Sequence, residues 1–213
     1  MVFIDKIKSL YPISAATERM LVDSVTVCRF SRKHLLVKAG EYCRSAYFTE
    51  KGMTRSYWLV DGNEITTSFS GVGDIVFSMD ELYYNKVSEE YVEALEDMVA
   101  YRICIGDLLE LFRTNIEIAN WGRIIHQNEY RRLHRSHRDR LTLSAEERYV
   151  EFRKQFPQVC QRVQLGYIAS YLGTTLPTLS RLRSKGTASG RNRQEGDEQC
   201  GDEKFVAGQI PDR

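Results

Sequence analysis

The chain has 213 residues, of which 42% are hydrophobic and 28% are charged, the composition of a globular protein rather than a disordered or fibrous one. No apolar run reaches the length of a bilayer-spanning helix and no secretory signal is recognised, so we expect a cytoplasmic protein without a membrane partner. The five cysteines form no CxxC pair and no metal-ligand spacing, which predicts reduced thiols and no metal site.

The net charge of +1 conceals an uneven distribution of charge along the chain. Residues 1–112 carry 12 basic and 17 acidic side chains, a net charge of −5, whereas residues 113–185 carry 14 and 6, a net charge of +8. Residues 186–213 carry 4 and 6, a net charge of −2. A basic segment behind an acidic one predicts a first domain that senses a signal and a second that contacts a polyanion.

The first third of the chain changes from a helical to a strand pattern. Apolar spacing predicts helix over about residues 5–23, with a break at Tyr11-Pro12. From Val25 to about Ile105, short runs rich in β-branched and aromatic residues alternate with glycine-rich or charged turns. Asp61-Gly62-Asn63 is a strong hairpin turn between two of these runs. Many short strands at this spacing predict a sandwich or a small barrel.

A long helix is predicted from about Thr114, after a short one over residues 106–112. Ile118, Trp121, Ile125 and Asn128 follow spacings of three and four, as in a coiled coil. Such a stripe needs a partner, either a second copy of the chain, with Asn128 helping to fix the register, or the β-domain of the same chain. We favour the dimer, because the helix becomes strongly basic immediately afterwards, over residues 131–140.

Residues 163–185 read as two short helices joined by a turn at Gly173. Ser144 is a predicted N-cap of the helix before them, and Thr174 or Thr175 can cap the second of the pair. This is the pattern of a helix-turn-helix, although an ordinary helical hairpin has the same local pattern. The second helix would present these residues outward: Thr178, Ser180, Arg181, Ser184 and Lys185. Residues 186–213 are rich in glycine and charge, which predicts a disordered tail.

In this order the elements resemble the Crp–Fnr family of bacterial transcription regulators. The motifs that carry the resemblance are Lys38-Ala39-Gly40-Glu41, Tyr47 to Gly52, the Gly73-Asp74 turn and the segment LGTTLPTLSRLR at residues 172–183. The resemblance implies an α+β chain with a double-stranded β-helix (jelly-roll-like) sensor domain, a long dimerisation helix and a C-terminal winged-helix-type helix-turn-helix domain. The corresponding boundaries are 1–112, 113–140, 141–185 and, for the tail, 186–213.

The resemblance also implies how DNA would be read. A homodimer would place two recognition helices in successive major grooves of a palindromic operator. Arg181 matches the family's base-reading arginine, with Thr178 and Ser180 beside it, and Thr175 matches the residue that caps the helix and touches a phosphate. The family often has a glutamate where Pro177 stands, so reading of a cytosine at that step is not expected here. RNA polymerase is a possible further partner.

The sensor departs furthest from the family pattern. The positions that bind the ribose and the cyclic phosphate in cyclic-nucleotide-binding members are here Phe77, Ser78, Ser88 and Glu89. Acidic neighbours at Asp80, Glu81 and Glu90 would repel a phosphate, so we expect an effector other than cyclic AMP. The N-terminal cysteine cluster of oxygen-sensing members is absent, so we expect neither an iron–sulfur cluster nor another cofactor.

Two functions follow from these observations. The first is a dimeric, sequence-specific DNA-binding transcription regulator. The alternative is a ligand-sensing or protein-interaction module whose helix-turn-helix is degenerate. An enzyme is not expected, because no nucleophile–base pair or phosphate-binding loop is present, and solvated or helix-capping positions explain the acidic pairs Glu89-Glu90 and Glu146-Glu147. Neither the effector, the operator nor the sign of regulation follows from the sequence.

Overall fold

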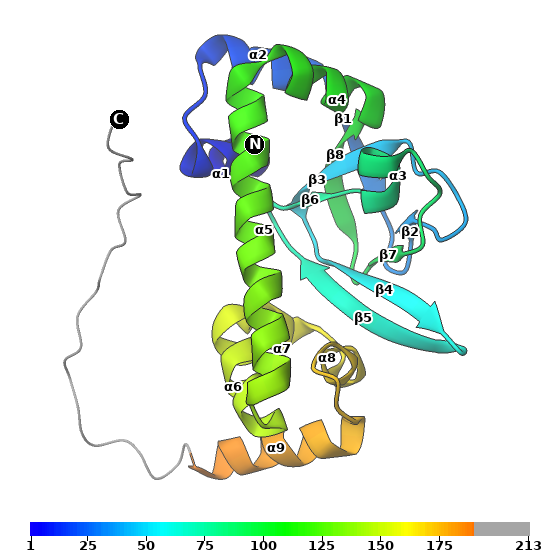
Figure 1. The fold of residues 1–213 in the computed structure, drawn as a ribbon, viewed down its shortest axis with the longest axis vertical. Helices are drawn as coiled ribbons and strands as arrows, with labels where there is room; N and C mark the ends of the chain where they lie inside the picture. The colour runs from blue at the N-terminus through cyan, green and yellow to red at the C-terminus, as the bar shows by residue number, and fades with distance from the viewer. Residues whose placement is uncertain (190–213) are drawn as a thin grey trace, which may run out of the picture.

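The computed structural model describes the backbone of residues 1–189 and the side chains of residues 1–184 (Figure 1). The helices are α1 (Val2–Leu10), α2 (Ala15–Asp23), α3 (Met79–Tyr84), α4 (Ile105–Thr114), α5 (Ile116–Thr142), α6 (Ala145–Gln155), α7 (Pro157–Arg162), α8 (Leu165–Tyr171) and α9 (Leu176–Ser189). The strands are β1 (Thr26–Phe30), β2 (Leu35–Val37), β3 (Ser45–Lys51), β4 (Thr54–Val60), β5 (Asn63–Ser70), β6 (Ile75–Val76), β7 (Tyr91–Ala94) and β8 (Met98–Cys104). None of the helices in this part of the chain is both long and apolar enough to cross a bilayer.

The strands form a roll of two antiparallel four-stranded sheets. Their orders are β1-β8-β3-β6 and β2-β7-β4-β5, and every predicted strand run contains one of these strands. Apolar side chains from both sheets share a core between them. The buried members of this core are Leu36, Val37, Tyr47, Val76, Val92, Ala94, Met98 and Ala100. The predicted jelly-roll-like domain is therefore confirmed, and burial raises the pKa of its Tyr47 hydroxyl to about 12.

The predicted hairpin turn joins β4 and β5. Asp61 and Gly62 both have positive φ angles, 50° and 77°, which is the backbone of a type I′ turn. In Figure 1 this hairpin extends from the roll past the C-terminal helices. Strand β5 is the outer strand of its sheet, so one of its edges has no strand partner among the described residues.

Helix α5 runs along the length of the molecule, with the roll against its first half and α6 to α9 around its lower end (Figure 1). Ile118 and Trp121 are only 0% and 2% exposed, because they lie in the core that α1, α4 and the first sheet form with α5. The helices approach closely: a Cβ added to Gly122 would stand 2.6 Å from a ring carbon of Phe112. Glycine at residue 122 is therefore a requirement of the packing of α4 on α5.

This burial corrects the dimer stripe inferred from the sequence. Ile118 and Trp121 are enclosed by their own chain and are not available to a second copy, and the half-buried Ile125 packs against the same core. Asn128 is exposed, but it does not continue an apolar seam. Of the two partners that the stripe allowed, the β-domain of the same chain is the one observed.

The C-terminal helices begin as predicted. Ser144 caps α6, and a reciprocal capping box with Glu147 is present. Two elements were not predicted, the short helices α3 and α7. Between residues 143 and 189 the described chain contains helices only, so no wing lies in this range. Helix α9 continues through residues 186–189, and residues 190–213 of the predicted tail lie outside the described residues.

Candidate nucleic-acid interface and sensor site

Helices α8 and α9 form one packed unit. Gly173 turns the chain between them with a φ of +64°, a conformation that favours glycine. Leu179 of α9 is fully buried against Ile168 and Leu172, in a cluster that also includes residues of α6 and α7. Because this leucine anchors the second helix from beneath, the opposite face of α9 points away from the core.

The outward face of α9 carries most of the residues predicted to read DNA. Ser180, Arg181 and Ser184 are exposed. The guanidinium of Arg181 makes no hydrogen bond or ion pair to any residue within 1–184, so its donors are available to a ligand. The Ser184 hydroxyl donates a 2.9 Å hydrogen bond to the carbonyl of Arg181. Lys185 belongs to α9, but its side chain lies outside the described residues.

The start of α9 is organised by two threonines. The amide of Thr178 donates to the hydroxyl oxygen of Thr175 over 3.3 Å, which makes Thr175 the N-cap that the sequence allowed. The two hydroxyl oxygens are 2.9 Å apart, and Thr178 is half-buried. The hydroxyl of Thr178 is therefore already engaged with the cap, which reduces its capacity to read a base.

Several basic side chains surround this unit. Arg131 and Arg135 on α5 are exposed and have no hydrogen bond or ion pair within the described side chains. Other arginines of the same helix are paired: Arg132 with Glu129 at 2.7 Å, and Arg138 with Asp139 at 2.6 Å. The lower half of α5 thus adds a positive field close to α9.

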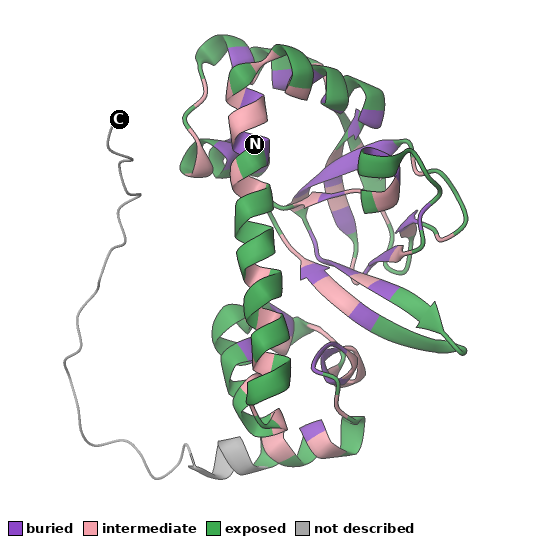
Figure 2. Ribbon diagram, in the orientation of Figure 1, coloured by how far each residue is buried: buried purple, intermediate pink, exposed green. Residues whose placement is uncertain are grey.

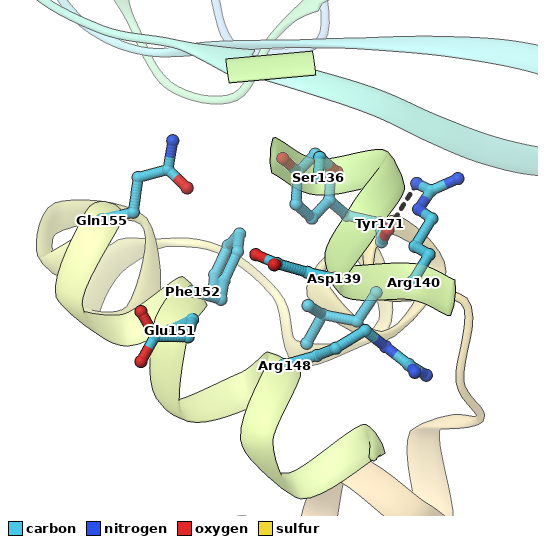
Figure 3. Close-up of a pocket in the computed structure, with 9 residues that line it drawn as sticks. Ser136, Asp139, Arg140, Arg148, Glu151, Phe152, Gln155 and Tyr171 are labelled. Atoms are coloured by element: carbon cyan, nitrogen blue, oxygen red, sulfur yellow. Dashed lines mark hydrogen bonds between the residues drawn. The ribbon is translucent and has the colours of Figure 1, made fainter. Parts of the chain in front are cut away.

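A small cavity lies where α5, α6 and α8 meet (Figure 3). Its volume is about 40 Å³. It is lined by Ser136, Asp139, Arg140, Arg148, Glu151, Phe152, Gln155, Tyr171 and Leu172. In Figure 3, Arg140 reaches the carbonyl of Tyr171, a hydrogen bond of 3.0 Å. The cavity has room for about three or four waters at roughly 10–15 Å³ each, and this is too little for a nucleotide.

The segment between β6 and β7 holds the four residues predicted to line an effector pocket. The Ser78 hydroxyl oxygen caps α3 by accepting from the amide of Glu81. Ser88 is buried and its hydroxyl donates to the carbonyl of Glu90 over 2.9 Å. The exposed Glu89 donates its amide to Asp80 over 2.9 Å, which ties the two ends of the segment together. Both serine hydroxyls are therefore engaged within their own segment.

Apolar packing occupies the space between this segment and α5. Phe77 is half-buried and packs against the core that contains Trp121. Tyr83 of α3 is hydrogen-bonded to His126 of α5. The pocket beside these residues has a volume of about 10 Å³ and a largely apolar lining. At the two positions where the resemblance places an arginine and a serine for the cyclic phosphate, this chain has Ser88 and Glu89.

The segment between β6 and β7 contains carboxylates, which repel a phosphate. Glu81 is buried and accepts the backbone amides of Cys43 and Arg44, at 2.7 and 2.9 Å. Glu90 accepts a hydrogen bond from Thr67, and its pKa is raised because burial disfavours its charged form more than this hydrogen bond favours it. The nearby carboxylate of Asp80 raises the pKa of Glu90 further.

Substitution of Glu90 by glutamine should stabilise the fold at neutral pH. The folded-state pKa of Glu90 lies above its unfolded value, so ionisation opposes folding as the pH rises through this range. At about pH 4, where the carboxyl of an unfolded glutamate is itself half protonated, the gain should be much smaller. Urea denaturation at both pH values measures the difference. The exposed Glu89→Gln variant is the control, and an equal gain in both variants would contradict the assignment.

Sequence reasoning missed the polar contacts that join the roll to α8. Arg55 is 1% exposed and Ser170 bonds to the backbone of β5. An arginine in a strand run that continues with Tyr57, Trp58, Leu59 and Val60 is the one signal that the sequence offered, and it does not identify a partner.

The roll, with the segment between β6 and β7, has the architecture of a cyclic nucleotide-binding domain. Residues 27–115, from β1 to the N-cap of α5, match the family model of the cyclic nucleotide-binding domain. The predicted resemblance to Crp–Fnr regulators is confirmed at the level of the fold by the solved structures to which the chain is similar. No curated relative matches the sequence.

Three of these structures are regulators from different bacteria. The c-di-GMP-responsive global regulator CLP of Xanthomonas campestris is 18% identical, with a TM-score of 0.65 over 86% of this chain and 96% of that one. FixK2 of Bradyrhizobium japonicum is 21% identical, with a TM-score of 0.66 over 78% and 86%. A candidate transcriptional regulator of the Crp/Fnr family from Eubacterium rectale is 16% identical, with a TM-score of 0.66 over 84% and 85%. At these identities the likeness is one of fold.

Proposed function

We propose that this protein is a homodimeric, sequence-specific DNA-binding transcription regulator of the Crp–Fnr type. The observation that carries the proposal is α9, which is anchored beneath by the buried Leu179 and presents the unpaired Arg181 outward. Helices α8 and α9, with their glycine turn, supply the helix-turn-helix. The basic charge of residues 113–185 and the likeness in fold to bacterial regulators support it. Such a regulator acts in the cytoplasm.

The recognition chemistry follows from the exposed side chains of α9. The guanidinium of Arg181 has the donor geometry for guanine O6 and N7 in the major groove. Ser180 lies beside Arg181 in the sequence and is also exposed, whereas Thr175 at the helix start is placed to meet a phosphate. Ser184 and Lys185, one turn further along, extend the interface. Contact with RNA polymerase stays a prediction of the resemblance.

A second copy would pair along the face of α5 that points away from the roll. Side chains on this face repeat with alternating spacings of three and four, as a two-helix seam requires. They are Ile116, Asn120, Arg123, Gln127, Tyr130, His134, His137 and Leu141. All but Asn120 are exposed, and Ile116, Tyr130 and Leu141 are each more than 70% exposed. Figure 2 shows exposed residues along α5 below its first turns. This register replaces the one that the sequence suggested.

We infer that the effector is not cyclic AMP. A cyclic phosphate needs positive charge and free donors, but Ser78 and Ser88 are engaged in their own segment and Asp80, Glu81 and Glu90 surround them with carboxylates. The match of residues 27–115 to the cyclic nucleotide-binding domain thus describes the architecture of the sensor. Isothermal titration with cyclic AMP tests the inference, and saturable binding would overturn it.

Fluorescence anisotropy with operator DNA, selected from a random library by the purified protein, tests the proposed function. Arg181→Ala should weaken binding to the selected site by about 1–3 kcal/mol, because a bidentate contact to a guanine is lost. Binding of the wild type should also weaken steeply with salt. Arg29→Ala, an exposed arginine on β1, is the matched control and should bind as the wild type does.

Selection that enriches no sequence, or equal binding of the Arg181 variant and the wild type to every sequence, would contradict the proposal. That result would favour the alternative function, a sensing module whose helix-turn-helix no longer reads DNA.

A further inference from the structure

Helix α8 covers the free edge of strand β5. The Ser170 hydroxyl oxygen accepts a hydrogen bond from the amide of Thr66 at 2.9 Å, and the same hydroxyl donates to the carbonyl of Glu64 at 3.0 Å. One side chain thus satisfies a donor and an acceptor that a neighbouring strand would otherwise pair. The first helix of the helix-turn-helix is therefore hydrogen-bonded directly to the sensor hairpin.

Arg55 is a second contact between the β4–β5 hairpin and α8. Its side chain is 1% exposed, and its guanidinium carbon lies 3.5 Å from the ring centre of Tyr167 on α8 and 4.3 Å from that of Tyr57 on β4. Glu93 of β7 accepts from it over 2.9 Å, and Glu64 of β5 is a second carboxylate partner. Burial opposes the charge of Arg55, but the bonds to both carboxylates outweigh it and raise its pKa. The guanidinium is thus a fixed cation against which Tyr167 stacks.

Apolar contacts complete this interface. Met53 and Phe69 of the roll are buried in the same cluster as the core residues of α6 to α9. The ring of Phe69 lies 5.6 Å from that of Tyr171 and 6.1 Å from that of Phe152. Tyr171 is in turn held on α5, because Arg140 donates to its carbonyl. The helix-turn-helix unit is thus docked on the roll as well as on α5.

We propose that Arg55, Tyr167 and Ser170 are positioning residues for DNA recognition: the β4–β5 hairpin of the sensor sets the orientation of α8 and, through it, of α9. The inference rests on the proposed DNA-binding function. Helices α8 and α9 share the buried Ile168, Ala169, Leu172 and Leu179, so a tilt of α8 on the hairpin carries α9 with it. A dimer contacts both half-sites of an operator at once only if its two recognition helices are separated by about one helical turn of DNA. A fixed orientation lowers the ordering cost of binding the operator.

Operator affinity of variants at the interface tests the proposal. Ser170→Ala and Tyr167→Leu should each weaken binding to the operator by about three- to tenfold, because the docked orientation is no longer held. Binding to unrelated DNA should change less than twofold, since phosphate contacts need no fixed orientation. Ser170→Thr keeps the hydroxyl and should restore operator affinity. Ser9→Ala, an exposed serine on α1, is the matched control.

A double-mutant cycle between the hairpin and α8 tests whether the two sides act through each other. Arg55→Met with Tyr167→Leu should bind the operator no more weakly than the worse of the two single variants. Additive losses would overturn the proposal, and so would unchanged or increased operator affinity in the Ser170 and Tyr167 variants. Circular dichroism and thermal melts identify a variant that has lost its fold. In that case the comparison of operator affinity between Ser170→Ala and Ser170→Thr tests the proposal.

Hydrogen exchange without DNA separates this proposal from the proposed function. In Ser170→Ala the amides of α8 and the amide of Thr66 should exchange faster than in the wild type, whereas those of β1 and β8 should not change. If no operator exists but this loss of protection is seen, the DNA-binding function fails while the docking of α8 on the hairpin stands. If the wild type binds an operator, and Ser170→Ala keeps both the exchange protection of α8 and the operator affinity of the wild type, the positioning role is wrong while the DNA-binding function stands.

Discussion

Replacement of Trp121 by alanine should lower the free energy of unfolding by about 3–5 kcal/mol, the usual cost of truncating a large buried aromatic side chain. Trp121 is 2% exposed, and its indole stacks with the ring of Phe112 at 6.3 Å between ring centres. The ring centre of Phe48 lies 6.0 Å from that of Trp121. Loss of the ring opens a cavity where α4, α5 and the first sheet meet. Urea denaturation followed by circular dichroism measures the effect.

The matched variant is Tyr130→Glu, on the outward face of the same helix. Tyr130 is 71% exposed, so its replacement should change the free energy of unfolding of one chain by less than about 0.5 kcal/mol. In sedimentation equilibrium it should instead weaken self-association at least about tenfold, because a carboxylate is placed in the proposed seam. If Trp121→Ala weakened association while leaving the fold intact, the burial of this stripe in its own chain would be wrong.

Replacement of Glu93 by alanine should cost about 3–5 kcal/mol, because it leaves the charge of Arg55 buried beside an empty site. The carboxylate of Glu93 is 10% exposed and accepts from two guanidinium nitrogens of Arg55, at 2.9 and 3.3 Å. Another guanidinium nitrogen of Arg55 is buried without a partner in the described structure, so this cation depends on its carboxylates. Chemical denaturation at constant pH measures the loss.

Glu64 provides the comparison for Glu93. It contacts the same guanidinium, but its side chain is 43% exposed. Solvent screens such a pair, so Glu64→Ala should cost no more than about 1 kcal/mol. Similar costs for the two variants would show that Arg55 is more solvated than its 1% exposure indicates.

Together with Ser170, these contacts connect the β4–β5 hairpin of the roll to the C-terminal helices. The hairpin holds α8, the first helix of the proposed DNA-binding unit, by its backbone edge and by one buried cation. A change in the sensor that moved β4 or β5 would therefore reach α9 through α8. In the segment between β6 and β7, the hydroxyls of Ser78 and Ser88 are bonded within the segment. This supports the proposal that the effector is not cyclic AMP.

Local structure in this chain could be predicted because it depends on neighbouring residues. The strand runs, the break at Tyr11-Pro12, the type I′ turn at Asp61-Gly62 and the cap at Ser144 all follow from side-chain chemistry within a few positions. The short helices α3 and α7 were missed, because six residues are too few for a helical period to appear.

The order of the elements, the roll and the anchoring of α9 by leucine could be predicted, because periodicity and turn chemistry depend on residues close together in the chain. The surface that Ile118 and Trp121 cover became evident only from the packing of whole elements, since an apolar stripe specifies that it must be buried but not by which chain. The tertiary structure alone also brought Arg55, Glu93 and Tyr167 together from positions 38 and 112 residues away. Contacts between residues so far apart depend on how whole elements pack, and no local pattern encodes them.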